Sequence, residues 1–143
     1  MKKQRPRERK LFTIEEANAA LPLVRAIATD LSNLAREIVE RRERLAFLMN
    51  GRNPDALDPY RSELAQIEEE LEKDSQRLQD YVRELAELGV EAKGGVEGLV
   101  DFPSLMDGRL VYLCWKLGEP EVIYWHEIES GFLGRQPLVA GSV

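Results

Sequence analysis

The sequence predicts an α+β fold, in which a long antiparallel helical hairpin is followed by a small antiparallel β-sheet packed on the first long helix. Up to Leu88, apolar residues recur at spacings of three and four, which is the period of an amphipathic helix. After Gly89 the period changes to two, and β-branched and aromatic residues become frequent. Turn-forming residues at 50–58 divide the helical part. We therefore expect the hairpin over about 14–88 and the β region over about 89–138.

The first helix begins at a capping box, in which Thr13 and Glu16 can each satisfy an unpaired backbone N–H. Pro22 follows, and its ring and missing N–H disfavour an uninterrupted helix. Two alternatives stay open: a short helix over about 14–21 followed by a long one, or one helix kinked at Pro22. The helical pattern runs to about Met49. Its apolar seam is interrupted by Arg41 and consists of Val24, Ile27, Leu31, Leu34, Ile38, Leu45 and Leu48.

The apolar stripe of this helix is unusually wide over residues 23–39. Leu23, Ala28, Ala35 and Val39 extend it to roughly half the circumference, compared with about 100° for a single contact. We expect this arc to meet both the second helix and the sheet. Any surplus predicts self-association through the helices.

The second helix is expected to start at Asp58, an N-cap residue, with Pro59 as its first residue. Its apolar face is narrow and is interrupted by Asp74. In an antiparallel hairpin, basic residues of the first helix should lie alongside the acidic run at 68–74, namely Arg41, Arg42 and Arg44. Exposed pairs of this kind contribute only about 0–1 kcal/mol each, so they mainly set orientation.

Three segments rich in β-branched and aromatic residues predict strands: 90–93, 109–117 and 121–128. Gly118-Glu119-Pro120 supplies a turn between the last two. The glycine-containing segments 98–109 and 131–138, on either side of this hairpin, are interpreted as loops. One hairpin face is almost wholly apolar, as in an antiparallel sheet with one side on a helix.

The pairing within this hairpin decides which side chains share a face. We expect Leu117 to pair with Val122. His126 then lies opposite Leu113 on the apolar face, and Cys114 lies on the other face. His126 is accordingly interpreted as a satisfied core or edge histidine, and Cys114 as a small buried residue with an inert thiol.

The chain's one histidine, its one cysteine and both tryptophans fall within 114–126. Strand-borne aromatic clusters are more often core than site, so packing is the first interpretation. A site is the alternative, because charged residues could converge at the glycine-rich end of the sheet. Paired arginines there could hold a carboxylate or phosphate, and a carboxylate could set the tautomer of the histidine. The candidate ligand-binding residues are Asp101, Arg109, Trp115, His126 and Arg135.

Signatures of known catalytic and metal sites are missing from the sequence. It contains no glycine-rich phosphate loop, HExxH, CxxC or nucleophile elbow. With one histidine and one cysteine, a zinc site would need mainly carboxylate ligands. We therefore expect no metal and no cofactor, and the sequence favours a protein that is not an enzyme.

The composition, 43% hydrophobic and 32% charged over 143 residues, is typical of one soluble domain, expected over 11–143. The net charge of −6 hides a basic arm at 1–10 with six Lys and Arg residues against one Glu. We interpret the arm as a disordered, solubilising tail. Nucleic-acid binding through residues 2–10 is the weaker alternative, because no aromatic residue accompanies the charges.

Targeting signals are not apparent in the sequence. A single cysteine excludes an intrachain disulfide, and no apolar run suits a membrane span or signal peptide. We expect a cytoplasmic protein without a membrane partner.

Several segments resemble a known family. They are FTIEEANAALPLVR, GLVDFP and GRLVYLCWKLGEPEVIYWHEIESGFLGRQPL. Together they make residues 11–138 similar to the prokaryotic family catalogued as domain of unknown function 2203. The resemblance implies a complete, single-domain bacterial or archaeal cytosolic protein, and it implies no catalytic residue. It directs attention to the same five candidates through GLVDFP, the LCW and WH pairs and the closing GRQPL.

Two functions therefore stay open. The first is a non-catalytic interaction or oligomerisation module, in which the helices pair two copies of the chain. The alternative is a small-molecule site, enzymatic or not, that binds an anionic ligand through Arg109 and Arg135 with His126 as acid or base.

Overall fold

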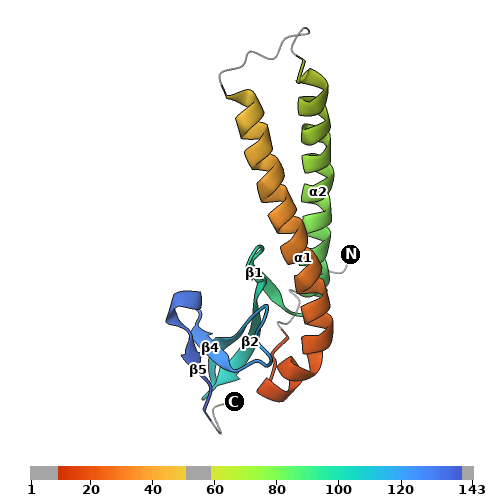
Figure 1. Ribbon diagram of the computed structural model, residues 1–143. Coiled ribbons are helices and arrows are strands. Elements are labelled where there is room, and N and C mark those ends of the chain that lie inside the picture. The colour runs from red at the N-terminus through yellow and green to blue at the C-terminus, as the bar shows by residue number, and fades with distance from the viewer. Residues whose placement is uncertain (1–9, 51–58, 140–143) are drawn as a thin grey trace, which may run out of the picture.

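The computed structural model describes residues 10–50 and 59–139 and confirms the α+β fold. Helices α1 (Ile14–Met49) and α2 (Arg61–Glu87) form the hairpin, and the sheet lies beside the N-terminal half of α1 (Figure 1). The rest of the hairpin extends beyond the sheet (Figure 1). Most of the predicted basic arm lies outside the described residues, as does Asp58.

Helix α1 is one helix that passes through Pro22, so the two-helix alternative is wrong. Figure 1 shows its first turns inclined to the rest, as expected where proline removes a helical hydrogen bond. The predicted capping box is present: the backbone N–H groups of Thr13 and Glu16 each donate to the other's side chain at 3.1 Å. In the same region, the Asn18 side chain accepts the N–H of Val122 at 2.8 Å and ties the helix to the sheet region.

The helices pack along their apolar seams, and the charged residue that interrupts each seam faces the other. Arg41 forms ion pairs with the buried Asp74 and, at 3.2 Å, with Glu70, so the predicted contact with the acidic run is confirmed for Arg41. Helix α2 starts at Arg61, two residues after Pro59, which was the predicted first residue. Neither helix, within the described residues, is both long and apolar enough to cross a membrane.

Most of the wide apolar arc of α1 is buried by contacts within the chain. Ala28 and Ala35 are buried, whereas Leu23 and Val39 are 54% and 42% exposed. Ser32 on this side of the helix donates its hydroxyl to the carbonyl of Val96 at 2.6 Å. The turn before β2 therefore rests directly on α1.

Five antiparallel strands follow α2 in chain order: β1 (Glu91–Gly94), β2 (Leu99–Met106), β3 (Arg109–Lys116), β4 (Tyr124–Glu127) and β5 (Gln136–Pro137). The interpretation of 98–109 as a loop is wrong, because most of it is β2. Its turn-forming residues lie at the strand's two ends, where Gly98, Asp107 and Gly108 have positive φ angles. The segment 131–138, also interpreted as a loop, contains the short 3₁₀ helix η1 (Phe132–Gly134) and β5.

Pro103 lies in the middle of β2, where a proline would normally argue against a strand. It is tolerated because the pairing with β1 ends at Asp101, so no neighbouring strand needs its missing N–H. Its carbonyl accepts the backbone N–H of Phe12 at 2.7 Å. The chain just before α1 thereby covers the edge that β1 leaves open.

The predicted pairing of β3 with β4 is wrong by one residue. Val111 pairs with Glu127 and Tyr112 with His126, so His126 does not lie opposite Leu113. The connection between the strands is wider than a tight turn because other groups hold it in place. The Asn18 side chain on α1 accepts the N–H of Val122, and the Trp115 indole donates to the carbonyl of Glu119 at 2.9 Å. A shift of one residue moves every side chain of β4 to the opposite face.

Candidate functional site

The two faces of the sheet differ in chemistry. The face toward α1 is apolar and joins the main core, with buried Val100, Phe102, Leu113 and Trp115. The opposite face, called the outer face below, carries Asp101, Tyr112, Cys114 and His126. Direct cross-strand pairing places Asp101 beside Cys114 and Tyr112 beside His126. The corrected register is what puts the histidine and the cysteine on one face.

Asp101, Cys114 and His126 form a buried cluster on the outer face. They come from the adjacent strands β2, β3 and β4. Nε2 of His126 lies 3.0 Å from both carboxylate oxygens of Asp101. One carboxylate oxygen of Asp101, Sγ of Cys114 and one ring nitrogen of His126 all lie within 4.8 Å of one another. Asp101 and His126 are each only 2% exposed.

His126 faces a hydrogen-bond acceptor on both sides of its ring. Nδ1 lies 2.7 Å from the carbonyl oxygen of Glu127, which can only accept, so Nδ1 carries a hydrogen. Nε2 faces the Asp101 carboxyl group, so a further proton must lie between them. Burial raises the pKa of Asp101, while the charge of His126 opposes that rise. Together the two residues share one proton and are neutral as a pair, which makes their burial tolerable.

Cys114 completes the cluster as a neutral thiol. Burial, with a further contribution from the negative charge of Asp101, raises the pKa of Cys114 to about 12. The thiol is therefore protonated at neutral pH and hydrogen-bonds the Asp101 carboxylate. This environment agrees with the interpretation of an inert thiol.

A hollow of about 260 Å³ opens beside the cluster. Asp101 and His126 contribute to its wall, together with Lys93, Leu99, Tyr112, Ile128, Gly131 and Phe132. An adjoining hollow of about 300 Å³ shares Lys93, Leu99 and Phe132 and adds Gly94, Glu97 and Lys116. The buried pair is therefore next to space that a small molecule could occupy.

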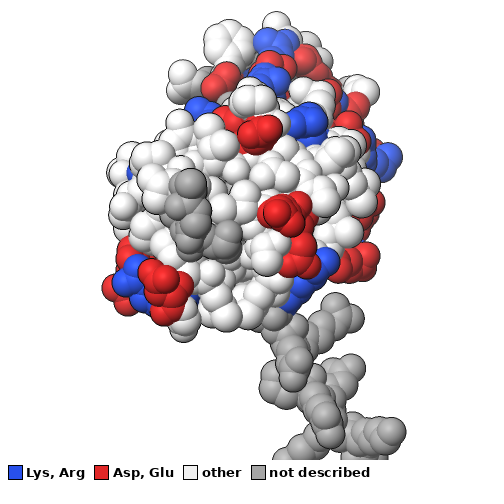
Figure 2. Space-filling model, turned by 90° about the horizontal axis from the view of Figure 1, so that it is seen from below, with Lys and Arg blue, Asp and Glu red and all other residues white. Residues whose placement is uncertain are grey.

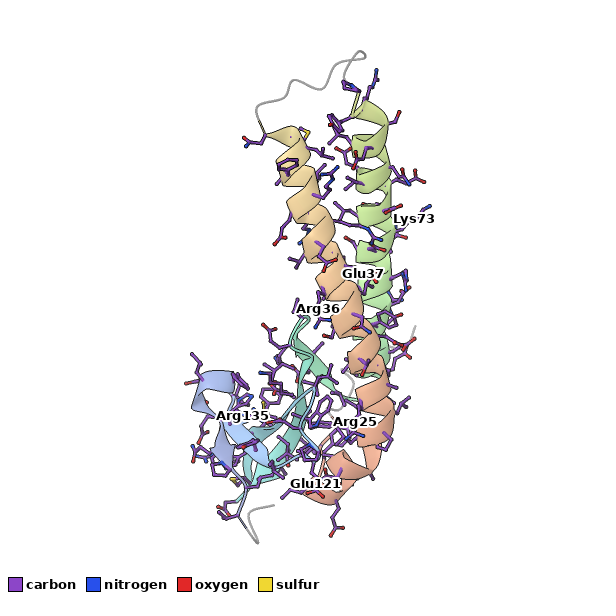
Figure 3. All side chains as sticks on the ribbon, in the orientation of Figure 1. Arg25, Arg36, Glu37, Lys73, Glu121 and Arg135 are labelled. Atoms are coloured by element: carbon purple, nitrogen blue, oxygen red, sulfur yellow. The ribbon has the colours of Figure 1, made fainter. Side chains whose placement is uncertain are left out.

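The two candidate arginines lie apart on the sheet. Arg109, at the start of β3, is largely exposed and pairs with Glu127 at 2.9 Å. Arg135 approaches the other end of β3, where it donates to the Glu119 carboxylate at 2.7 Å and to the Cys114 carbonyl at 3.4 Å. Figure 3 shows Arg135 on the side of the sheet remote from α1. These two residues do not form the paired-arginine site considered from the sequence.

Arg135 and Trp115 both make contacts within the chain. The guanidinium carbon of Arg135 lies 3.9 Å from the ring centre of Tyr124 and 4.8 Å from that of Phe132. Arg135 thus holds η1 and β5 against the sheet. Trp115 is fully buried toward α1, with its indole N–H bound to the carbonyl of Glu119.

Sequence reasoning missed Lys93, Lys116 and Tyr112 as wall residues of the hollows, and it did not connect Cys114 with His126. The lysines gave no signal, since a single lysine on a strand is ordinary. The contact between Cys114 and His126 depends on the register of β3 with β4. The sequence analysis assumed a tight turn between these strands and therefore a register one residue away. Asp101 and His126 are the two candidates that the structure brings together.

Comparison with known proteins identifies the family. Residues 10–138 match the sequence profile of a family described as uncharacterized conserved protein (DUF2203). The chain belongs to the DUF2203 family. No curated protein and no solved structure matches it. The cluster of this DUF2203 protein draws one residue from each of three segments noted for the resemblance: Asp101 from GLVDFP, Cys114 from LCW and His126 from WH.

Proposed function

We propose that this DUF2203 protein binds a small anionic molecule on the outer face of its sheet, the second of the two roles considered from the sequence. The observation that carries the proposal is the hollow of about 260 Å³ that has the Asp101–His126 pair in its wall and Lys93 beside it. Small-molecule sites commonly combine a mostly apolar wall with a few polar groups. A titratable buried pair in such a wall is a frequent mark of function.

Two lysines lie in the walls of the hollows, beside Glu97 in the adjoining one, and they could attract an anion although the chain as a whole is acidic. Lys93 pairs with Glu91 at 3.1 Å, yet its side chain is 40% exposed. Lys116, from the adjoining hollow, forms no ion pair with any described residue, and its Nζ lies 5.8 Å from the ring centre of Phe132. A carboxylate or phosphate could therefore reach both ammonium groups while an apolar part contacts Phe132 and Leu99. If the ligand is also converted, the Asp101–His126 pair supplies the acid and the base.

Nuclear magnetic resonance of the untagged protein tests this role, because His126 is the chain's one histidine. We expect inorganic phosphate and citrate, added separately, to shift the imidazole signals saturably. The double variant Lys93→Gln/Lys116→Gln should weaken binding about tenfold or more, which corresponds to about 1.4 kcal/mol.

Lys73→Gln is the matched control. Lys73 pairs with Glu69 at 3.3 Å on the exposed surface of α2, and Figure 3 shows it far from the sheet. Saturable shifts in the wild type and the control, weakened in the double variant, support the proposal. Absence of any shift at millimolar anion, or equal shifts in all three proteins, contradicts it.

Self-association through the helices is a second candidate, because Leu23 and Val39, at the two edges of the apolar arc of α1, are each exposed. Seen from below, the end of the molecule shows white areas interrupted by acidic side chains, and most charged side chains lie around its margin (Figure 2). Sedimentation equilibrium at micromolar concentration should give a dimer that Leu23→Glu or Val39→Glu weakens. A strict monomer contradicts this role.

A further inference from the structure

We propose that Asp101, Cys114 and His126 form a binding site for a divalent transition-metal ion such as Zn²⁺. This inference does not depend on the proposed anion binding, because the ammonium groups that would hold an anion, those of Lys93 and Lys116, are not among the three metal ligands. It differs from the expectation of no metal, because that expectation considered ligands by sequence spacing and by a register that separated the cysteine from the histidine.

The donor set suits zinc and its neighbours in the transition series. A thiolate, an imidazole nitrogen and a carboxylate oxygen are the three ligand types that zinc uses in proteins. Thiolate and imidazole favour such ions over Mg²⁺ and Ca²⁺, which prefer all-oxygen sites. All three side chains extend from paired strands of one sheet, so the backbone holds them in a fixed relation.

The spacing of the donor atoms is close to what a tetrahedral ion requires. Ligands at about 2.0–2.3 Å from one zinc ion lie roughly 3.3–3.8 Å from each other. Nε2 of His126 and the Asp101 oxygens are 3.0 Å apart, and all three donors lie within 4.8 Å of one another. Small side-chain rotations therefore suffice to admit the ion.

The orientation of His126 is an independent observation that points to a metal. Its Nδ1–H donates to the carbonyl of Glu127 at 2.7 Å, which fixes the ring and directs Nε2 into the cluster. Metal-binding histidines usually donate their other ring N–H to a carbonyl or carboxylate in this way.

The charge balance allows the exchange of protons for metal within a buried site. Without metal, the cluster holds the thiol proton and the proton shared by Asp101 and His126, and its net charge is zero. A divalent ion that displaces both protons leaves a thiolate, a carboxylate and a neutral imidazole, again with zero net charge. Neither state places an unpaired charge in the interior.

Three protein ligands leave one position of a tetrahedral ion open. Asp101 and His126 also border the hollow of about 260 Å³, so the fourth position can be reached from there. Zinc sites with three protein ligands and an accessible fourth position are characteristic of catalysis, whereas structural sites are closed by four protein ligands.

Cobalt titration provides the test, because Cys114 is the chain's one cysteine. Untagged, reduced protein is first freed of metal with a chelator, and Co²⁺ is then added alone. Binding should produce a near-ultraviolet thiolate-to-cobalt band that saturates at one equivalent and is removed by Zn²⁺ but not by Mg²⁺. The band should disappear in Cys114→Ser. Asp101→Asn and His126→Gln should each weaken binding about tenfold or more, since even outer partners of metal ligands contribute about 10–100-fold.

Glu129→Gln, which removes an exposed carboxylate three residues after His126, is the matched control and should keep the full band. Circular dichroism checks that each variant is folded. If His126→Gln does not fold, Asp101→Asn still tests the site. Failure of wild-type protein to give a band at millimolar Co²⁺ overturns the proposal. So does a band of unchanged affinity in Asp101→Asn, which would exclude the Asp101 carboxylate as a ligand. The Lys93→Gln/Lys116→Gln variant separates this result from anion binding, because only the latter should weaken there.

Discussion

Two substitutions of Asp101 should differ sharply in their effect on stability. With Nδ1–H bound to Glu127, a neutral His126 presents Nε2 as an acceptor. The amide N–H of Asp101→Asn can donate to that nitrogen, so we expect a loss of less than about 1 kcal/mol in the free energy of unfolding. Asp101→Ala leaves Nε2 and the Cys114 thiol without their partner and opens a small cavity. Its cost should be about 2–4 kcal/mol.

Urea unfolding of metal-free protein, followed by circular dichroism, measures both values. The pH dependence gives a second criterion. Because burial raises the pKa of Asp101 above its usual 3.8, the folded state binds more protons than the unfolded state above that pH. The stability contributed by this group is full below about pH 3.8 and is lost as pH rises through the raised pKa, a trend that Asp101→Asn should lack. Equal costs for Asn and Ala would refute the hydrogen bond from residue 101 to Nε2. An unchanged trend in Asp101→Asn would refute the raised pKa of Asp101.

Three further outcomes follow from other contacts. Arg41→Leu should cost about 1–3 kcal/mol in urea unfolding, because it leaves the buried Asp74 without its main partner. The double variant Arg41→Leu/Asp74→Leu should recover most of that loss, and a further decrease in stability would contradict this account. Cys114, with a pKa of about 12, should react with a thiol reagent at pH 8 only as fast as the protein unfolds. Rapid labelling of the folded protein would contradict the buried, protonated thiol and show an accessible thiolate. Arg135→Ala should lower the unfolding free energy by about 1–3 kcal/mol, because a nearly buried ion pair with Glu119 is broken; an unchanged midpoint would show that η1 and β5 are held by other contacts.

The helical half of the fold is predictable because its signals are local. The capping box at Thr13 and the three- and four-residue spacings identify α1, since every helical hydrogen bond joins residues four apart. The ends of the helices were less certain, as the start of α2 at Arg61 shows. The sequence even showed that Arg41 and Asp74 interrupt the two apolar seams. Their direct contact could not be predicted, because it depends on how the two helices are positioned relative to each other.

The sheet was harder because its pairing depends on distant groups. Pro103 and the glycines around β2 form a sequence pattern typical of a loop. The segment is a strand because Phe12, about ninety residues earlier in the chain, hydrogen-bonds its open edge at the Pro103 carbonyl. The register of β4 is set partly by Asn18 on α1, which no pattern within 109–128 can reveal. The sequence therefore indicated Asp101 and His126 as candidates that could converge, whereas it did not indicate the contact of either with Cys114.

The hairpin contains two separate apolar clusters with the Arg41–Asp74 pair between them along the helices. Among the described residues, the distal cluster has Leu48, Leu64 and Ile67 as its buried members, whereas the proximal one includes the sheet. Amide hydrogens near Met49 and Arg61 should therefore exchange with solvent through local opening, at a lower free energy than those near Val24. The far end of the hairpin should thus open as a separate unit. A protease site, label or fused domain could be introduced there while the packing around Asp101 and His126 remains intact.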